Sequence, residues 1–406
     1  MKALLFSVNI PQWTLLQALR PFSRKPFARG PLATVRLAEV PEPAMPGDGW
    51  VKIETRLCGF CASDLNLIYL QDSPTASPFT SFPCIMGHEV YGVVAGTGAA
   101  VSGFEEGQRV VVAPHLDCAV RGIDPPCGPC ARGRFANCEN FAEGKLAPGM
   151  FTGICRDAGG GFAPFFTAHK SQLFAVPEEV PGKAAVLTEP LAVALQAVYD
   201  NCPRDGEHVL VIGGGVIGSL IVRVIRALEV DCRITVSDPA PTAANLAIAS
   251  GADRIIGRED FYERAAEITG ATVYKPLLGQ RVLMGGYSRV FDAVGTSATL
   301  NTVLRCTGAG GAISLVGIGH NVKLDLTPMW LKHLSLEGTF AYGRIDLDGQ
   351  QRHVFSHALQ WLAEGRIAVA DMLTHTFALE DFEAMLAVNL NKEKHGAVKT
   401  AFSFEG

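Results

Sequence analysis

The stretch 208-HVLVIGGGVIGSLIVRVIRALEVDCRITVSD-238 decides the fold of half of this chain. It reads as an apolar strand, a glycine turn, a helix and a second strand, and Gly213, Gly215 and Gly218 form the pattern GxGxxG. In such a turn the first glycine permits the tight bend. The second lets a pyrophosphate approach the backbone, and the third lets helix and strand pack closely. The position of the pattern, after a strand and before a helix, predicts a dinucleotide-binding turn.

Asp238 ends the second strand, 20 residues after Gly218. A carboxylate there can accept hydrogen bonds from both adenosine ribose hydroxyls and repels a 2′-phosphate. The following PAPTAAN (239–245) contains no Arg or Lys, so NAD is favoured over NADP. The alternative is that Asp238 only caps a turn. Strand and helix patterns continue to alternate beyond it, which predicts a doubly wound parallel sheet.

Potential metal ligands gather much earlier, in CGFCASDLN (58–66) and PCIMGHEVYGVV (83–94). Cys61 offers a thiolate and His88 an imidazole, which are ligands that Zn²⁺ prefers. A catalytic zinc needs three protein ligands and one open position. Glu189, in LTEPLAVALQA, is the candidate for the third ligand. Each residue alone would more often be a buried thiol, an ordinary histidine or a helix-start carboxylate.

Four motifs in this order, GFCASD, GHEVYGVV, TEPLAVAL and VIGGGVIG, resemble the zinc-dependent medium-chain alcohol, polyol and threonine dehydrogenase family. The resemblance implies Cys61, His88 and Glu189 as ligands of a catalytic zinc. It also implies an α/β fold with two domains. A GroES-like, partly open β-barrel would span 1–186 and be completed by 344–406, and a Rossmann-type NAD-binding domain would span 187–343.

Family resemblance also assigns roles around the zinc. Ser63 would hydrogen-bond the alcohol oxygen and carry its proton outward, and Asp64 would orient His88. The alternative for both is a capping pair at a helix start. Glu89 would support the site or enter the metal shell transiently, or be structural. Some relatives place a relay histidine where this chain has Asn66, and an amide cannot replace imidazole as a proton carrier near neutral pH.

Further cofactor contacts are implied by FDAVG and LVGIG, which resemble the family strands that end at nicotinamide and its ribose. Buried strand ends would look the same. The expected cofactor-binding residues, in addition to the three glycines and Asp238, are Val216, Ile217, Val294, Gly295, Val316 and Gly317.

A cysteine cluster lies in DCAVRGIDPPCGPCARGRFANC (117–138). Cys127, Cys130 and Cys138 resemble the last three of the four ligands in the family's structural zinc lobe. The first of these cysteines is missing. Asp124 holds its place and is the tentative fourth ligand, while Cys118 lies a few residues earlier. A lobe with free thiols and no metal is the alternative.

Composition narrows the class of protein. The 406 residues are 48% hydrophobic and 18% charged, with a net charge of −5 and no Lys/Arg block, so neither nucleic acid nor a membrane is expected as a partner. Eleven cysteines without a secretory signal indicate a reducing, cytoplasmic location. The basic segment RPFSRKPFARGP (20–31) is expected to be a surface loop, with a substrate entrance or subunit contact as alternatives. A homodimer or homotetramer is expected.

The expected activity is the reversible oxidation of an alcohol. A secondary alcohol is favoured because the motif with Glu189 in place of a third cysteine resembles the polyol, threonine and secondary-alcohol branch of the family. Zinc would act as the Lewis acid and NAD as the hydride acceptor. Two alternatives remain. One is a metal-free reductase of the same superfamily that acts on an activated double bond, and the other is a zinc-stabilised NAD-binding redox sensor without catalysis.

Overall fold

A computed structural model describes residues 1–405 of the chain, which separate into two units. The first unit combines Met1–Glu189 with the C-terminal segment from Asp346 onward, and the second unit comprises Pro190–Ile345. The C-terminal segment therefore returns to the N-terminal unit.

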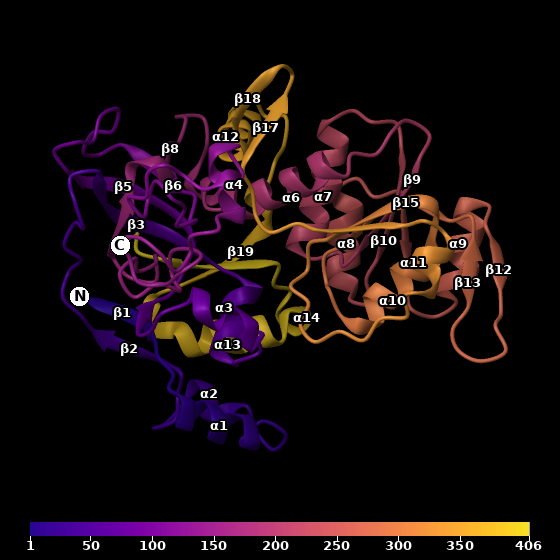
Figure 1. Cartoon of the computed structure of the whole chain (residues 1–406), viewed down its shortest axis with the longest axis horizontal. Helices are drawn as coiled ribbons and strands as arrows, with labels where there is room; N and C mark the ends of the chain where they lie inside the picture. The colour runs from indigo at the N-terminus through magenta and orange to yellow at the C-terminus, as the bar shows by residue number, and fades with distance from the viewer. Residues whose placement is uncertain (406) are drawn as a thin grey trace. The chain divides into compact units, whose positions relative to one another are not determined.

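The first unit is built on a seven-stranded sheet (Figure 1). Its strand order is β19-β20-β3-β5-β6-β8, and β7 pairs with β3. The strands are β3 (Trp50–Phe60), β5 (Glu89–Thr97), β6 (Arg109–Val112), β7 (Phe165–His169), β8 (Leu173–Ala175), β19 (Leu373–Phe377) and β20 (Lys399–Ser403). The long strand β3 is central because it pairs with β5, β7 and β20. This arrangement confirms the predicted GroES-like barrel.

A smaller sheet, in the order β2-β1-β4, carries the N-terminal segment. Its strands are β1 (Lys2–Phe6), β2 (Val35–Glu39) and β4 (Cys84–Ile85). The segment between β1 and β2 contains two helices, α1 (Ile10–Leu19) and α2 (Lys25–Ala28). Within the basic segment 20–31, only the four residues of α2 are helical, so the expected surface loop is interrupted by one short helix. Asn9 caps α1 and Pro11 occupies its first turn, which are strong helix-start signals. Leu16 and Phe27 bury their side chains and anchor the two helices.

The other helices of the first unit have at most ten residues. They are α3 (Ala62–Ile68), α4 (Gly128–Ala131), α5 (Gly182–Ala185), α12 (Val354–Ala363), α13 (Phe382–Leu390) and α14 (Lys392–His395), together with the 3₁₀ turns Pro74–Phe79, Phe135–Asn137, Lys170–Gln172, Ala370–Met372 and Leu379–Asp381. Helix α12 begins at Val354. The preceding β18 (Gln350–His353) pairs with β17 (Arg344–Leu347), and His353 caps α12.

The second unit holds a six-stranded, wholly parallel sheet in the order β11-β10-β9-β14-β15-β16. The strands are β9 (His208–Ile212), β10 (Arg233–Ser237), β11 (Arg254–Ile256), β14 (Tyr287–Asp292), β15 (Thr307–Leu315) and β16 (Ser335–Gly338). Numbered within the unit, this order is 3-2-1-4-5-6, the doubly wound arrangement. The predicted Rossmann-type fold is confirmed.

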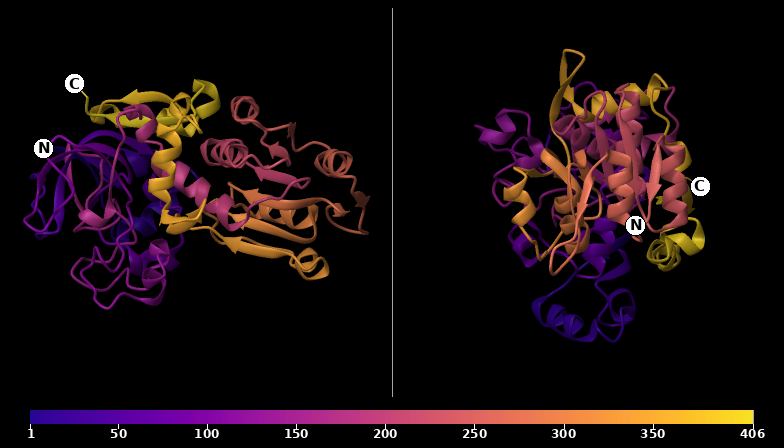
Figure 2. Two further views of the ribbon diagram at one scale, coloured as in Figure 1. Left: turned by 90° about the horizontal axis from the view of Figure 1, so that it is seen from above. Right: turned by 90° about the vertical axis from the view of Figure 1, so that its right-hand side faces the viewer.

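Helices cover both faces of this sheet (Figure 2). They are α6 (Thr188–Asp200), α7 (Val216–Ala227), α8 (Pro241–Ala249), α9 (Phe261–Thr269), α10 (Ser297–Cys306) and α11 (Thr327–Leu331). Right-handed crossovers put helices on opposite faces when the strand order runs in opposite directions from β9. The excursion over 269–288 contains the hairpin of β12 (Thr272–Tyr274) and β13 (Val282–Met284). In such a sheet, ligands bind outside the carboxyl ends of the strands, at the point between β9 and β14 where the strand order reverses.

Within residues 1–405, every helix falls short of the length and apolar character that a membrane crossing requires.

Candidate active site and cofactor site

Cys61 lies where strand β3 ends and helix α3 begins. It is the N-cap residue of α3, in an extended conformation (φ −100°, ψ 160°). Its backbone N–H donates a hydrogen bond of 2.8 Å to the carboxylate of Asp64, which is only 3% exposed. The capping role that the sequence left open for Asp64 is therefore present. This bond fixes the backbone that carries the Cys61 thiol.

His88 approaches Cys61 from the start of strand β5. The preceding Gly87 has φ +96°, and a Cβ atom at that position would lie 2.5 Å from the ring of Phe162. Glycine is therefore required for the bend that directs His88 inward. The His88 Nε2 atom lies 3.3 Å from the hydroxyl oxygen of Ser63. Its Nδ1 atom lies 3.7 Å from the Asp64 carboxylate, within range of charge interaction but beyond a good hydrogen bond.

Donor atoms of Cys61, His88 and Glu89 all lie within 4.8 Å of one another. Sulfur, imidazole nitrogen and carboxylate oxygen are a donor set that suits Zn²⁺. His88 and Glu89 are buried and Cys61 is half-buried, so the cysteine is the member of the group most open to solvent. The structure thus brings together two of the three ligands implied by resemblance, with Glu89 as the nearby carboxylate.

Glu189, the third ligand implied by resemblance, lies outside this group of three. It is half-buried in the first turn of α6. Its charge nevertheless contributes, less than those of Asp64 and Cys61, to raising the pKa of His88.

Electrostatics make this cluster a favourable place for a cation. Burial lowers the pKa of His88, but the Asp64 carboxylate and the Cys61 thiol outweigh it and raise the pKa to about 10. Burial in turn raises the pKa of Asp64 to about 6, against the opposing effect of His88. Surroundings that stabilise a buried imidazolium are equally suited to stabilising a divalent metal ion.

Lys399, on strand β20, forms a buried ion pair with Glu89. The lysine is 4% exposed and the glutamate 1% exposed. Burial lowers the pKa of Lys399, and the Glu89 carboxylate more than compensates, so that the pKa is raised. A Cβ atom on Gly59, the cross-strand neighbour of Glu89, would clash with the same carboxylate. The site therefore holds Glu89 in place from two sides.

Four cysteines gather in a second potential metal centre, the cysteine lobe: Cys118, Cys127, Cys130 and Cys138. The Sγ atoms of Cys118 and Cys138 are 3.7 Å apart, and those of Cys127 and Cys138 are 3.9 Å apart. These separations are far longer than a disulfide bond and suit ligands around one tetrahedral ion. Asp124, the tentative fourth ligand, is exposed and lies outside this group, whereas Cys118 belongs to it.

Backbone N–H groups point at the sulfurs of this lobe. Glu139 donates to Cys127, Asn140 donates to Cys138, and Cys127 donates to Cys118. Burial raises the pKa of the Cys127 thiol, but N–H donors outweigh it and lower the pKa to about 7. Such donors stabilise thiolates, the form in which cysteine binds zinc.

In the second unit, the glycine turn follows strand β9. Gly213 has φ +94°, and a Cβ atom on Gly218 would lie 1.8 Å from the Gly213 carbonyl oxygen. Both positions therefore require glycine. At Gly215, the N-cap of α7, an added Cβ atom would meet no protein atom within 4 Å. The space beside Gly215 and the free N–H groups of Val216 and Ile217 at the helix start form a cradle that fits a pyrophosphate.

Asp238 follows strand β10 and is half-buried beside this turn. One of its oxygens accepts the Gly214 N–H and the other accepts the Ala240 N–H, both at 2.8 Å. Asp238 therefore does cap this turn, which is the alternative role that the sequence left open. Each oxygen keeps a second lone pair, so the same fixed carboxylate retains the capacity to accept a ribose hydroxyl.

Buried Asp292 organises the ends of β14 and β15. Its side chain accepts the N–H groups of Val294 and Gly295 at 2.9 Å, and its carbonyl oxygen accepts those of Val316 and Gly317. These four sequence-predicted contacts therefore meet in one loop cluster, at the carboxyl end of the sheet beside β9. Asp292 itself was not predicted, although its place in FDAVG was a signal.

Comparison with known proteins places these features in one family. Residues 47–178 match the family described as "Alcohol dehydrogenase GroES-like domain", and residues 216–364 match the one described as "Zinc-binding dehydrogenase". The chain belongs to the zinc-dependent medium-chain dehydrogenases. The donor sets around Cys61 and in the cysteine lobe fit zinc, the metal that the second description names.

Among similar proteins, sorbitol dehydrogenase from Arabidopsis thaliana is 26% identical over 87% of this chain and 88% of its own length. The solved structure of 2R,3R-butanediol dehydrogenase from Bacillus subtilis has a TM-score of 0.71 at 24% identity, covering 91% of this chain and 96% of that one. An E. coli CFT073 alcohol dehydrogenase complexed with NADH has a TM-score of 0.75 at 22% identity, covering 100% and 99%. At these identities, the two structures show that this chain shares their fold.

Lys399 is the residue of the site that sequence reasoning missed. It was part of an expected final strand, HGAVKTAF, and nothing in the local pattern connects it with Glu89, 310 positions earlier. A lysine inside an otherwise apolar strand was the available signal, because lysine is almost never fully buried unless it is paired.

Proposed function

We propose that this chain oxidises a secondary alcohol, of the polyol or diol type, to a ketone with NAD as the hydride acceptor, and catalyses the reverse reduction. The supporting observation is the cluster of Cys61, His88 and Glu89, with the Ser63 hydroxyl 3.3 Å from His88. The sorbitol and 2R,3R-butanediol dehydrogenases that resemble this chain are named for substrates with secondary hydroxyls.

Cys61, His88 and a carboxylate from Glu89 or Glu189 would hold the zinc. When bound there, zinc supplies Lewis acidity that makes the hydroxyl of an alcohol easier to deprotonate. Ser63 lies beside His88 and is half-exposed. Its hydroxyl can accept the proton of the alcohol while donating its own hydrogen outward. Because Asn66 cannot take that proton as a histidine would, we propose that it passes from Ser63 to water.

For the cofactor, we propose that Asp238 selects NAD. Its carboxylate is oriented by the N–H groups of Gly214 and Ala240. A 2′-phosphate would bring a second negative charge against it, and residues 239–245 offer no cation to compensate. NAD supplies the hydride-accepting ring. Residues Val294, Gly295, Val316 and Gly317 would line its nicotinamide end.

The decisive experiment compares matched alcohols. NAD reduction is measured with propan-2-ol against propan-1-ol, and with sorbitol and 2R,3R-butanediol, each with NAD and with NADP. We expect higher kcat/KM for the secondary alcohol and for NAD. Cys61→Ala should lose activity while keeping the zinc of the cysteine lobe. Full activity after removal of all zinc would instead favour the metal-free reductase, and NADH binding without turnover of any alcohol would favour the redox sensor.

A further inference from the structure

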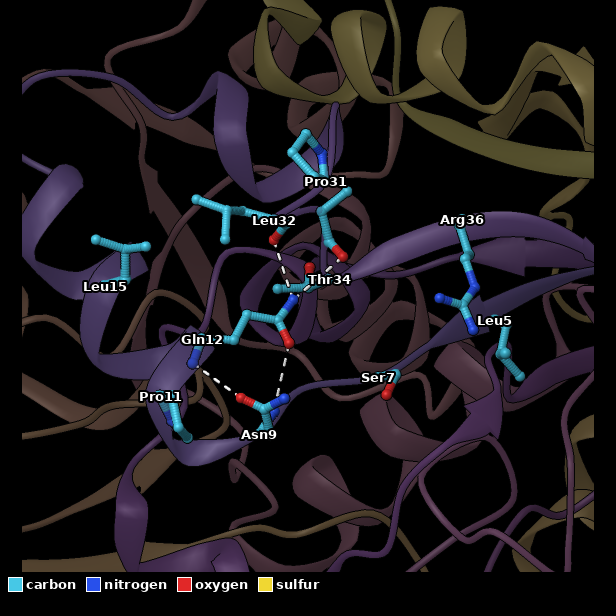
Figure 3. A pocket seen from close by; sticks show the side chains of 11 residues that line it. Leu5, Ser7, Asn9, Pro11, Gln12, Leu15, Pro31, Leu32, Thr34 and Arg36 are labelled. Atoms are coloured by element: carbon cyan, nitrogen blue, oxygen red, sulfur yellow. Dashed lines mark hydrogen bonds between the residues drawn. The ribbon is translucent and has the colours of Figure 1, made fainter.

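A cavity of about 440 Å³ lies beside helix α1 and shares no residue with the candidate active site. Its floor is one face of the small sheet. Leu5 and Arg36 are directly opposite each other on β1 and β2, and Ser7 and Thr34 follow on the same face because side chains alternate along a strand. Figure 3 shows Leu5, Ser7, Thr34 and Arg36 among the side chains that line the cavity. Its volume is within the range of small-molecule sites.

Helix α1, which forms one wall of the cavity, is held in position by hydrogen bonds. Asn9 and Gln12 bond each other at the start of the helix, with the Gln12 N–H donating to Asn9 at 2.9 Å. The Gln12 amide also donates to the Leu32 carbonyl oxygen at 3.0 Å, across to the opposite wall (Figure 3). The cavity is therefore preformed, which lowers the cost of ordering on binding.

Chemically, the lining has one charge and several apolar surfaces. Arg36 is the single charged residue that lines it, while Leu5, Leu15 and Leu32 supply apolar walls. Across the described part of the chain, residues 1–405, no acceptor lies within hydrogen-bonding or ion-pairing distance of the Arg36 guanidinium. By contrast, Arg20 donates to two carbonyl oxygens and Arg29 pairs with Glu383. The Arg36 side chain is thus available to an anion.

We propose that this cavity binds a small monocarboxylate with a short apolar chain. The guanidinium of Arg36 would take the carboxylate in a two-pronged hydrogen bond, a geometry that a lysine could not offer. One arginine balances one negative charge, which favours a carboxylate over a doubly charged phosphate. Leu5, Leu15 and Leu32 would cover the apolar chain.

This site is distinct from the metal cluster. Thr34, on the cavity floor, donates to the carbonyl oxygen of Ile68 at 2.7 Å, where helix α3 ends. Cys61 caps the opposite end of α3. A helix of seven residues spans about 10 Å, so a carboxylate held by Arg36 does not reach the Cys61 thiol. The proposal goes beyond the proposed function and does not rest on it.

Titration of octanoate into the full chain, loaded with zinc and NADH, tests this site by calorimetry, with 1-octanol as the uncharged probe of equal chain length. We expect saturable binding of one octanoate per chain and much weaker binding of 1-octanol. Arg36→Gln should weaken octanoate binding about tenfold or more, since a charge-assisted bond is lost. Ser63→Ala should leave it unchanged. Equal binding to the Arg36→Gln variant, loss in Ser63→Ala, or no saturable binding to the wild type would each overturn the proposal.

Two substitutions of opposite charge at Leu15, in the wall of the cavity, give a second, independent test. Leu15 is 46% exposed, so Leu15→Glu and Leu15→Lys should both fold. The glutamate should repel octanoate and abolish its binding, whereas the lysine should preserve or strengthen it. Ile10→Glu adds the same charge on α1 at a residue outside the lining and should bind octanoate as the wild type does. Equal affinities for the Leu15→Glu and Leu15→Lys variants would also overturn the proposal.

Discussion

Lys399 and Glu89 form an ion pair in the interior of the first unit, although 310 residues separate them in the sequence. The pair joins strand β20, near the C-terminus, to the start of strand β5, where His88 and Glu89 border the metal cluster. It is the point at which the C-terminal segment contributes directly to the site. A chain without its last strand would leave the Glu89 carboxylate buried and unpaired.

Replacing Lys399 by methionine should therefore destabilise the protein strongly. Removing one partner of a buried ion pair leaves an uncompensated charge, which costs about 3–5 kcal/mol. The measurement is the free energy of unfolding in urea. The double variant Lys399→Met with Glu89→Gln should recover part of the loss, since the stranded charge is gone. If the double variant is as unstable as the sum of the two single variants, the pair contributes nothing specific.

The glycine turn offers a matched pair of substitutions. Gly218→Ala places a Cβ atom 1.8 Å from the Gly213 carbonyl oxygen, so both stability and NADH binding should fall, with stability lower by about 1–3 kcal/mol or more. Gly215→Ala meets no protein atom, and its stability should stay within about 0.5 kcal/mol of the wild type. It should still weaken NADH binding, because the methyl group fills the space expected for pyrophosphate. Unchanged NADH fluorescence titrations in Gly215→Ala would contradict this placement.

Local patterns predicted the fold well, because each element carries its own signal. The glycine spacing after β9 and the alternation in β3 need no knowledge of the rest of the chain. The prolines and arginines of 20–31 indicated a loop, which the structure interrupts with the four-residue helix α2. Helix α1, which Asn9 caps just upstream of that segment, was not predicted. Long-range pairings were inaccessible, because the contact of Lys399 with Glu89 depends on sheet order and not on local sequence.

The metal sites also show that contacts between distant residues cannot be predicted from local sequence. Sequence spacing identified Cys127, Cys130 and Cys138, but Asp124 was placed as the fourth ligand because it occupies the expected position. In the structure, the chain around 118–127 brings the Cys118 sulfur to the other three, and Asp124 faces solvent. Distance along the chain was a poor guide here, since a loop of nine residues can return to its starting point.

Substitutions at these two residues should therefore differ. Cys118→Ser should lower the zinc content by about one ion per chain and reduce the thermal unfolding temperature, because a closed site contributes to folding. Asp124→Asn should retain the full zinc content and the wild-type unfolding temperature. Zinc is measured by atomic emission after dialysis, with Cys202→Ser as a cysteine control outside the lobe. Loss of zinc in Asp124→Asn but not in Cys118→Ser would restore the prediction made from spacing.

Lys332 provides a test of pH dependence away from the metal sites. The residue is 2% exposed, and its ammonium group donates to the carbonyl oxygens of Leu283, Arg305 and Thr307. Burial lowers its pKa from 10.5 to about 8, against the opposing effect of Cys306. The unfolded chain therefore binds more protons than the folded one between pH 8 and 10.5. The contribution of Lys332 to stability should rise with pH across that window, and be lost as pH falls through 8.

The lowered pKa of Lys332 sets the size of this change in stability, which comes to roughly 3 kcal/mol between pH 8 and pH 10.5. Other groups titrate in the same range, so the test is the difference between the wild type and Lys332→Met in urea unfolding at pH 7.5 and pH 10. The wild type should gain stability relative to the variant as the pH rises. Parallel stability curves for the two proteins would mean that the three carbonyl oxygens stabilise the ammonium group enough to cancel the effect of burial.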